Sequence, residues 1–282
     1  MSDSHKPLYI FLHIPRTAGT TITHHIARNF TPEETLRLYP DELGMLNSNK
    51  RYYSQSDYKE MINSYVSRIP KKQKNNIKII FGHYVYKGIE KYFDKDPYFF
   101  TVVRDPVNRA ISSYNFWATS YYHSRNINFL VKNGFLIDGK VETDVYKWNK
   151  AKTKDHNVSS FSLNLDRYLS YLNFNTDLSD FDFVGLTEKS RNDFLYIYNL
   201  LDIDTHFPRS NVSRVYQKTV HKKALKDYIS TYTNDYQIYK RALKLNRMYK
   251  QKHTDFYDKV SSQRRKQMFS LYPLRAIVRR FS

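Results

Sequence analysis

Four short apolar runs, separated by segments of helical pattern, constrain the fold of this chain more than any other feature. The runs are rich in β-branched and aromatic residues, as buried strands are, and cover residues 8–13, 77–81, 98–103 and 182–186. Helical patterns cover residues 57–69, 107–122 and 188–203, the second after Pro106 and the third after a capping Thr187. This alternation predicts an α/β fold with three layers, a parallel sheet flanked by helices.

Polar turns follow three of the predicted strands. They read PRTAGT after the first strand, GHYVYKG after the second and RDPVNRA after the third. Ligands of open parallel sheets bind at the carboxyl ends of the strands. We therefore expect these three turns to converge on one site.

The first turn has the composition of an anion site. A turn that contains Gly19 and opens a helix presents backbone N–H groups to an anion, and the helix dipole adds to the attraction. Thr17, Thr20 and Thr21 supply hydroxyl groups, and Arg16 supplies charge. The triphosphate signature G-x-x-x-x-G-K-[ST] is absent. The alternative interpretation is that the threonines only cap a helix.

The third turn offers a second anion site. Arg104 ends a buried strand, where a charge needs a partner, and Ser112 lies about two helical turns further on. These two residues could hold a phosphate, or Arg104 could form a structural bridge to an acidic group. For Arg109 we expect the structural role, with Asp105 or a loop carbonyl as its partner.

His83 is the candidate general base. It follows Gly82 at the end of the second predicted strand, and its side chain titrates near neutral pH in the absence of perturbation. A structural histidine is the alternative. His13, His24 and His25 are weaker candidates, because the first ends a predicted strand and the others lie along the first helix.

Charge is concentrated at the carboxyl-terminal end of the chain. The net charge is +19, and residues 206–282 hold 19 Lys and Arg against four Asp and Glu. Polyanions, nucleic acid, an anionic membrane surface or a merely solvated helical surface would each account for this excess. The basic pattern over 217–269 is helical, and the end of the chain could be a packed or frayed helix or could lie on a membrane.

Composition also excludes several classes of chemistry. The 282 residues include no cysteine, so disulfides, thiolate nucleophiles and Cys-ligated zinc are excluded. The first residues have no signal-peptide pattern, and no apolar run approaches the roughly 18 residues of a membrane span. We expect a cytoplasmic protein with at most peripheral membrane contact.

Two segments resemble the donor-binding motifs of sulfotransferases that use 3′-phosphoadenosine 5′-phosphosulfate. FLHIPRTAGTTI, residues 11–22, is similar to their 5′-phosphosulfate loop, and TVVRDPVNRAISSYNFW, residues 101–117, to their 3′-phosphate segment. FGHYVYKG resembles the Gly-His segment of the carbohydrate branch, which contains the heparan and uronyl 2-O-sulfotransferases, and residues 180–194 and 209–214 resemble further blocks there. The similarity covers roughly residues 8–245 and implies a fold like that of P-loop NTPases.

The resemblance implies a reaction and a set of residues. A sulfuryl group would move by in-line displacement to a carbohydrate hydroxyl, with His83 as general base, Arg16 stabilising charge and no metal. The implied donor-binding residues are Arg16, Thr17, Ala18, Gly19, Thr20, Thr21, Arg104 and Ser112. Many relatives have Lys in place of Arg16, so a role of this residue as proton donor is in doubt.

The resemblance also bears on partners and domains. We expect a sulfotransferase domain over 1–250 and a basic helical tail over 251–282 that packs on the domain or is surface-associated. The acceptor would be a glycan, a polysaccharide or a glycolipid, and nucleic acid is not expected as a partner. Family members in the Golgi carry a membrane anchor that this sequence lacks, which favours a bacterial or viral enzyme. A P-loop kinase or hydrolase and a non-enzymatic polyanion binder are the alternatives.

Overall fold

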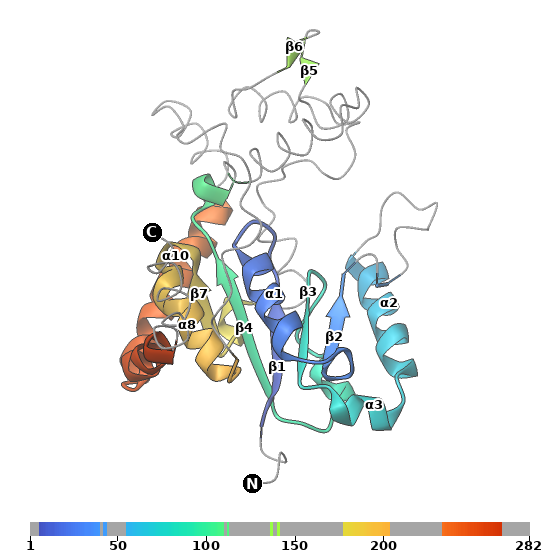
Figure 1. Cartoon of the computed structure of the whole chain (residues 1–282). Helices are drawn as coiled ribbons and strands as arrows, with labels where there is room; N and C mark the ends of the chain where they lie inside the picture. Colours follow the sequence, from blue (N-terminus) through green and yellow to red (C-terminus); the bar gives the residue numbers. More distant parts are fainter. Residues whose placement is uncertain are drawn as a thin grey trace, which may run out of the picture.

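The structure, a computed structural model, describes residues 6–39, 42–43, 55–109, 112, 136–137, 140–141, 177–203 and 233–266. Its centre is a five-stranded sheet with all strands parallel and in the order β2–β3–β1–β4–β7 (Figure 1). A short antiparallel pair, β5 (Leu136–Ile137) with β6 (Lys140–Val141), stands apart from it. The strands of the main sheet are β1 (Leu8–Leu12), β2 (Thr35–Leu38), β3 (Ile79–Gly82), β4 (Pro97–Val103) and β7 (Phe183–Leu186).

Helices cover both faces of the sheet, so the predicted α/β fold with three layers is confirmed. On one face, α2 (Gln55–Arg68) and α10 (Thr233–Lys252) pack against the strands in one core cluster. On the other face, α1 (Gly19–Asn29), α8 (Ser190–Leu200) and a helix at residues 256–266 form the second cluster. Shorter helical segments are η2 (Pro32–Glu34), α3 (Lys71–Asn76), η4 (Glu90–Tyr92), η5 (Leu178–Asp180) and η6 (Thr187–Lys189).

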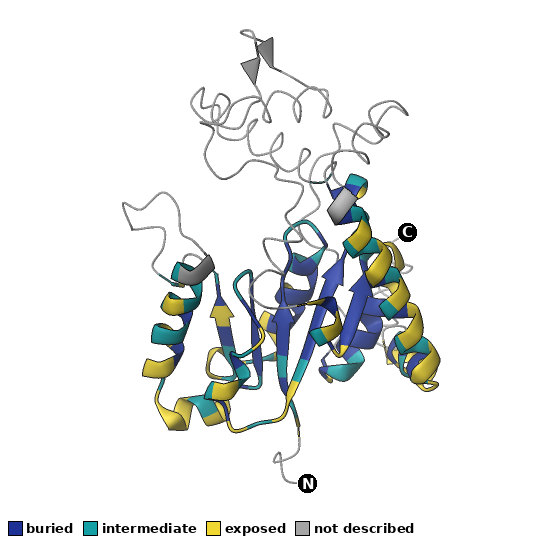
Figure 2. Cartoon of the chain, turned by 180° about the vertical axis from the view of Figure 1, so that it is seen from behind, coloured by how far each residue is buried: buried dark blue, intermediate teal, exposed yellow. Residues whose placement is uncertain are grey.

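The central strand shows why these runs could be recognised in the sequence. Successive side chains of a strand point to opposite faces, and here both faces are covered. Ile10 faces the α2 and α10 side and Phe11 faces the α1 and α8 side, yet both are completely buried. Figure 2 shows the strands buried almost throughout and the outer faces of α2 and α10 exposed.

All four predicted strands are confirmed, but the prediction of four strands missed β2. This edge strand pairs with β3 from Thr35 opposite Ile79 to Leu38 opposite Gly82. It has only four residues, and Arg37 within it is exposed, so its sequence lacks the apolar run of a strand buried on both faces. Of the predicted helix 107–122, residues 107–109 and 112 are helical, and the other residues lie outside the described part of the chain.

The first part of the basic tail packs on the sheet domain. In the helix at residues 256–266, Phe256 and Val260 are buried within the α1 and α8 cluster. Residues 267–282 lie outside the described residues. Among the helices that the structure describes, none combines the length and apolarity required to cross a bilayer.

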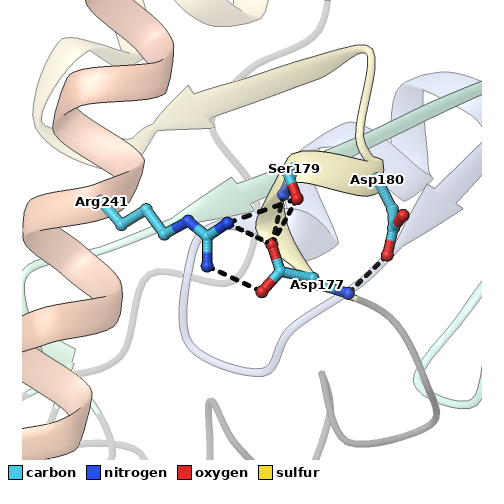
Figure 3. A network of polar contacts seen from close by, with 4 residues as sticks. All are labelled: Asp177, Ser179, Asp180 and Arg241. Carbon is cyan, nitrogen blue, oxygen red and sulfur yellow. Dashed lines mark hydrogen bonds and ion pairs between the residues drawn. The ribbon is translucent and has the colours of Figure 1, made fainter.

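Two polar networks fasten α10 to the sheet. At the start of η5, Arg241 binds Asp177 at 2.7 Å and the hydroxyl of Ser179, while Asp177 caps η5 (Figure 3). The second network is buried: Asp193 of α8 accepts from the backbone N–H of Leu186 at the end of β7 and pairs with Lys250 of α10 at 2.5 Å. Asp193 therefore joins two helices on opposite faces to the sheet's edge strand.

We expect Asp193→Ala to lower the free energy of unfolding by about 3–5 kcal/mol, because it leaves the ammonium of Lys250 buried without its carboxylate. Urea unfolding followed by circular dichroism measures this change. Asp255→Ala is the matched control, since Asp255 pairs with Lys259 at the surface and its loss should change stability little. Equal effects of the two substitutions would contradict this role of Asp193.

Candidate functional site

The three polar turns leave the sheet side by side, as the sequence predicts. β1 lies between β3 and β4, with Leu12 opposite Gly82 on one side and Thr101 on the other. The chain runs from β1 to β2 and β3 on one side, and then crosses to β4 and β7 on the other. Open α/β sheets bind ligands where the strand order reverses in this way.

The turn between β1 and α1 has a strained, left-handed backbone. Arg16 and Ala18 have φ angles of 69° and 65°, which cost non-glycine residues about 1–3 kcal/mol each. Left-handed residues in a turn gather backbone N–H groups into a concavity that suits an anion. Ala18 is the N-cap of α1 and gives the helix no side-chain cap, so a ligand can serve the first N–H groups of the helix.

The threonines of this turn take different positions. Thr17 is fully buried, and its hydroxyl donates to the carbonyl of Ile14 at 2.8 Å, a bond that shapes the turn. Thr20 is half-buried on the first turn of α1, and Thr21 is buried with its N–H on the carbonyl of Ala18. Of the three threonines, Thr20 is therefore the one whose side chain is most exposed to a ligand.

Gly19 allows α1 to start against the ring of His13. A Cβ atom at position 19 would lie 2.1 Å from Cδ2 of His13, which is far inside any real contact. The close approach brings the amino end of α1 down onto the carboxyl end of β1. Gly19 is thus required by space rather than by its backbone angles.

Two arginines lie together between the first and third turns. The side chain of Arg16 donates to the hydroxyl of Ser112 at 3.0 Å, and Nη1 of Arg104 donates to the carbonyl of Arg16 at 3.2 Å. Burial, together with the charge of Arg104, lowers the pKa of Arg16 to about 10, so Arg16 remains a cation at neutral pH. The structure brings all three predicted residues together, and an anion here would be held by both guanidinium groups.

Arg109 has the structural role that the sequence predicts. It is almost completely buried, and Nη2 lies 3.3 Å from Oδ2 of Asp235, which is also buried. The sequence suggested Asp105 or a loop carbonyl as the partner. The pair with Asp235, which the sequence did not predict, ties the helix after β4 to α10.

His83 is held with one ring nitrogen on the protein backbone. Nδ1 of its ring lies 2.6 Å from the carbonyl oxygen of His13, and its backbone N–H donates to the carbonyl of Leu38. A carbonyl can only accept, so Nδ1 carries a proton and Nε2 is the basic nitrogen of the neutral ring. Glycine is required at position 82 because a Cβ atom there would lie 2.1 Å from the carbonyl oxygen of Leu38. Gly82 thus lets the backbone of His83 come close to Leu38.

The rings of His13 and Tyr39 pack against the ring of His83. Nδ1 of His13 lies 2.8 Å from the hydroxyl of Tyr39, and the ring of His83 contacts both rings at centroid distances of 4.6 and 4.8 Å. Burial, and then the neighbouring His83 and Arg16, lower the pKa of His13 well below its usual 6.5. His13 is therefore neutral at physiological pH and suits a supporting role.

The other two candidate histidines, His24 and His25, lie on α1. His24 is exposed, and His25 is buried against the ring of Tyr198 at 4.4 Å. Neither position favours a role as base over that of His83.

Sequence reasoning missed three residues of the site. Tyr39 follows β2, the strand that was not recognised. Thr187 was interpreted as a helix cap, but it lies in η6 and its hydroxyl donates to the carbonyl of Thr17 at 2.8 Å. Glu188 accepts from the N–H of Asp105 at 3.0 Å, and burial and this neighbouring carboxylate raise the pKa of Asp105. The position of Thr187 and Glu188 after β7 was the available signal.

Potential metal ligands do not cluster in the described ranges, where no group of three or more His, Asp or Glu side chains could hold an ion. Arg16, Arg104 and Ser112 instead bring guanidinium and hydroxyl donors together. Such donors suit an anionic ligand rather than a cation.

Comparison with known proteins now adds the class of protein. The model of the sulfotransferase family matches residues 1–274, so the chain belongs to the sulfotransferase family. A solved structure of a sulfotransferase from Alicyclobacillus acidocaldarius matches with a TM-score of 0.35 and 11% identity, covering 82% of this chain and 93% of that one. No curated protein matches the sequence.

Adenosine 3′,5′-bisphosphate is the nucleotide that the sequence resemblance implies. We expect Gly19→Ala to weaken its binding by at least about 10-fold, because the new methyl group pushes α1 away from His13. Ala18→Gly should bind within about threefold of the wild type, because glycine adopts the same left-handed angles without strain. Isothermal titration calorimetry compares the two adjacent substitutions. Equal affinities would show that the start of α1 can shift without loss.

Proposed function

We propose that this member of the sulfotransferase family transfers a sulfuryl group from 3′-phosphoadenosine 5′-phosphosulfate to a carbohydrate hydroxyl. The observation that carries the proposal is the left-handed turn at Arg16 and Ala18, which opens α1 beside the guanidinium group of Arg104. It supplies backbone N–H groups for the 5′-phosphosulfate end of the donor. Arg104, Arg16 and Ser112 supply charge and hydrogen bonds for its anionic groups.

The donor-binding residues divide into two groups. Arg16, Thr17, Ala18, Gly19, Thr20 and Thr21 would surround the 5′-phosphosulfate. Arg104 and Ser112 would hold the 3′-phosphate, and the bond between Ser112 and Arg16 would couple the two groups. Charge-assisted hydrogen bonds of this kind are stronger than neutral ones, which suits a ligand with two separate anionic ends.

His83 would act as general base. The bond from Nδ1 to the carbonyl of His13 keeps Nε2 as the proton acceptor, and the same carbonyl would stabilise the imidazolium that forms. The acceptor oxygen would form a bond to sulfur while the bond from sulfur to the 5′-phosphate oxygen breaks. Arg16 would stabilise the charge that grows on the departing phosphate and would keep its own proton.

The identity of the acceptor, a carbohydrate, is the most specific part of the proposal. It rests on the resemblance of FGHYVYKG to the carbohydrate branch and on the net charge of +19, which would attract acidic saccharides. A cytoplasmic location and peripheral membrane contact through the basic carboxyl-terminal region stay predictions.

Calorimetric titration tests the donor. We expect the protein to bind adenosine 3′,5′-bisphosphate without metal and to bind ATP with Mg²⁺ much more weakly. Arg104→Ala should lower the affinity for the bisphosphate by about 10–100-fold, which corresponds to the loss of one or two charge-assisted hydrogen bonds. Arg241→Ala is the matched control, because Arg241 is an exposed arginine that pairs with Asp177 before β7. A preference for ATP would favour a kinase, and salt-sensitive binding of any polyanion without the bisphosphate would favour a polyanion binder.

His83→Ala tests the base. We expect it to lower transfer from labelled donor by about 10²–10⁴-fold while the affinity for adenosine 3′,5′-bisphosphate stays unchanged. The assay uses a panel of uronic-acid polysaccharides and glycolipids as acceptors. His24→Ala, on the exposed side of α1, is the control and should transfer at the wild-type rate. Undiminished transfer by His83→Ala would remove His83 from the mechanism.

A further inference from the structure

We propose that η6, the segment that directly follows β7, positions both anion-binding turns: Thr187 holds the turn after β1, and Glu188 holds the turn after β4. This inference rests on the proposed function, because it assigns the two contacts to the two anionic ends of the donor. Neither side chain is proposed to touch the donor. Both belong to the block at residues 180–194 that resembles the carbohydrate branch but has no role in the reaction as described above.

Thr187 fixes the direction of one peptide group in the strained turn. Its hydroxyl donates to the carbonyl of Thr17 at 2.8 Å, across 170 residues of sequence. The peptide between Thr17 and Ala18 is trans, so the N–H of Ala18 points away from Thr187. With the carbonyl held on one side, this N–H is directed to the other, where the left-handed turn gathers its donors.

The neighbouring peptide group is held in the same manner. Arg104 donates to the carbonyl of Arg16 at 3.2 Å, which directs the N–H of Thr17 away from Arg104. Two side chains from the ends of β4 and β7 therefore hold consecutive carbonyls of one turn. Left-handed angles at Arg16 and Ala18 are unfavourable by themselves, so these bonds from outside the turn favour its shape.

Glu188 acts on the backbone next to Arg104. Its Oε1 accepts from the N–H of Asp105 at 3.0 Å, and its Oε2 accepts from the hydroxyl of Tyr239 on α10 at 3.3 Å. Asp105 in turn accepts from the N–H of Asn108 and so starts the helix that carries Ser112. A carboxylate near bound phosphate would repel it, so this residue suits the positioning of the turn and not the binding of a ligand.

The two contacts make opposite predictions for the two ends of the donor. Thr187→Val replaces the hydroxyl with a methyl group of similar size and should weaken the binding of adenosine 3′,5′-bisphosphate and of adenosine 5′-monophosphate by at least about 10-fold each. It should leave adenosine 3′-monophosphate within about threefold of its wild-type affinity. Glu188→Ala should show the reverse pattern, with the 3′-monophosphate weakened and the 5′-monophosphate nearly unchanged. A substitution that merely loosened the fold would weaken all three ligands together.

The measurement is calorimetric titration of the full chain with each nucleotide, by competition where binding is weak. Thr187→Ser and Glu188→Gln keep an atom that can make the same bond and should restore affinity to near the wild-type value. Thr35→Val is the matched control, because the hydroxyl of Thr35 also donates to a backbone carbonyl, that of Pro32, but far from the site. Melting temperatures of all variants accompany the titrations.

The outcomes separate this inference from the function on which it rests. Selective loss of one monophosphate in each variant, with rescue by the conservative substitutions, supports the positioning role. If the wild type binds the bisphosphate but both variants weaken all three nucleotides equally, or weaken none, the positioning role is overturned while the donor site stands. If the wild type does not bind the bisphosphate, the proposed function and this inference are both overturned.

Discussion

The direction of two peptide groups, those on either side of Thr17, is the constraint on which the rest of the site depends. The backbone conformation of this turn does not follow from local preference, because Arg16 and Ala18 adopt left-handed angles that non-glycine residues disfavour. Arg104 at the end of β4 and Thr187 at the end of β7 hold the two carbonyls. The proposed anion site is therefore a tertiary feature, complete only when β1, β4 and β7 lie in their order in the sheet.

The site has two halves that share β1. On one side, β4 and β7 supply the residues around the turn. On the other side, β3 and β2 supply His83 and Tyr39, which meet the ring of His13. Neighbouring strands lie about 4.7–4.9 Å apart, so the spacing of the sheet sets the separation between the proposed base and the proposed anion site. The proposed in-line transfer requires fixed positions of nucleophile, sulfur and leaving oxygen, and a parallel sheet holds the turns after its strands in fixed positions.

The sequence could predict those features of the fold that depend on a local pattern of residues. Strands buried on both faces appear as apolar runs with polar turns after them, so the position of Arg16 and His83 after neighbouring strands could be predicted. The missed features depend on distant partners. Thr187 has the local pattern of a helix cap, yet its hydroxyl reaches residue 17. Arg109 has an acidic neighbour four residues earlier, yet its side chain pairs with Asp235. Tyr39 follows a four-residue edge strand too short to show a period.

The arginine at position 16 fits the chemistry of the proposed leaving group. A departing phosphate ester has its last pKa near 6 and leaves as a stable anion at neutral pH, so it needs charge beside it and not a proton. Even with its pKa lowered to about 10, Arg16 supplies that charge, and its planar group can bind the phosphate while donating to Ser112. A lysine offers one ammonium in place of this fork. In the proposed donor site, Arg at this position in place of Lys would replace a flexible point charge with a cation that links the two anion-binding groups of residues.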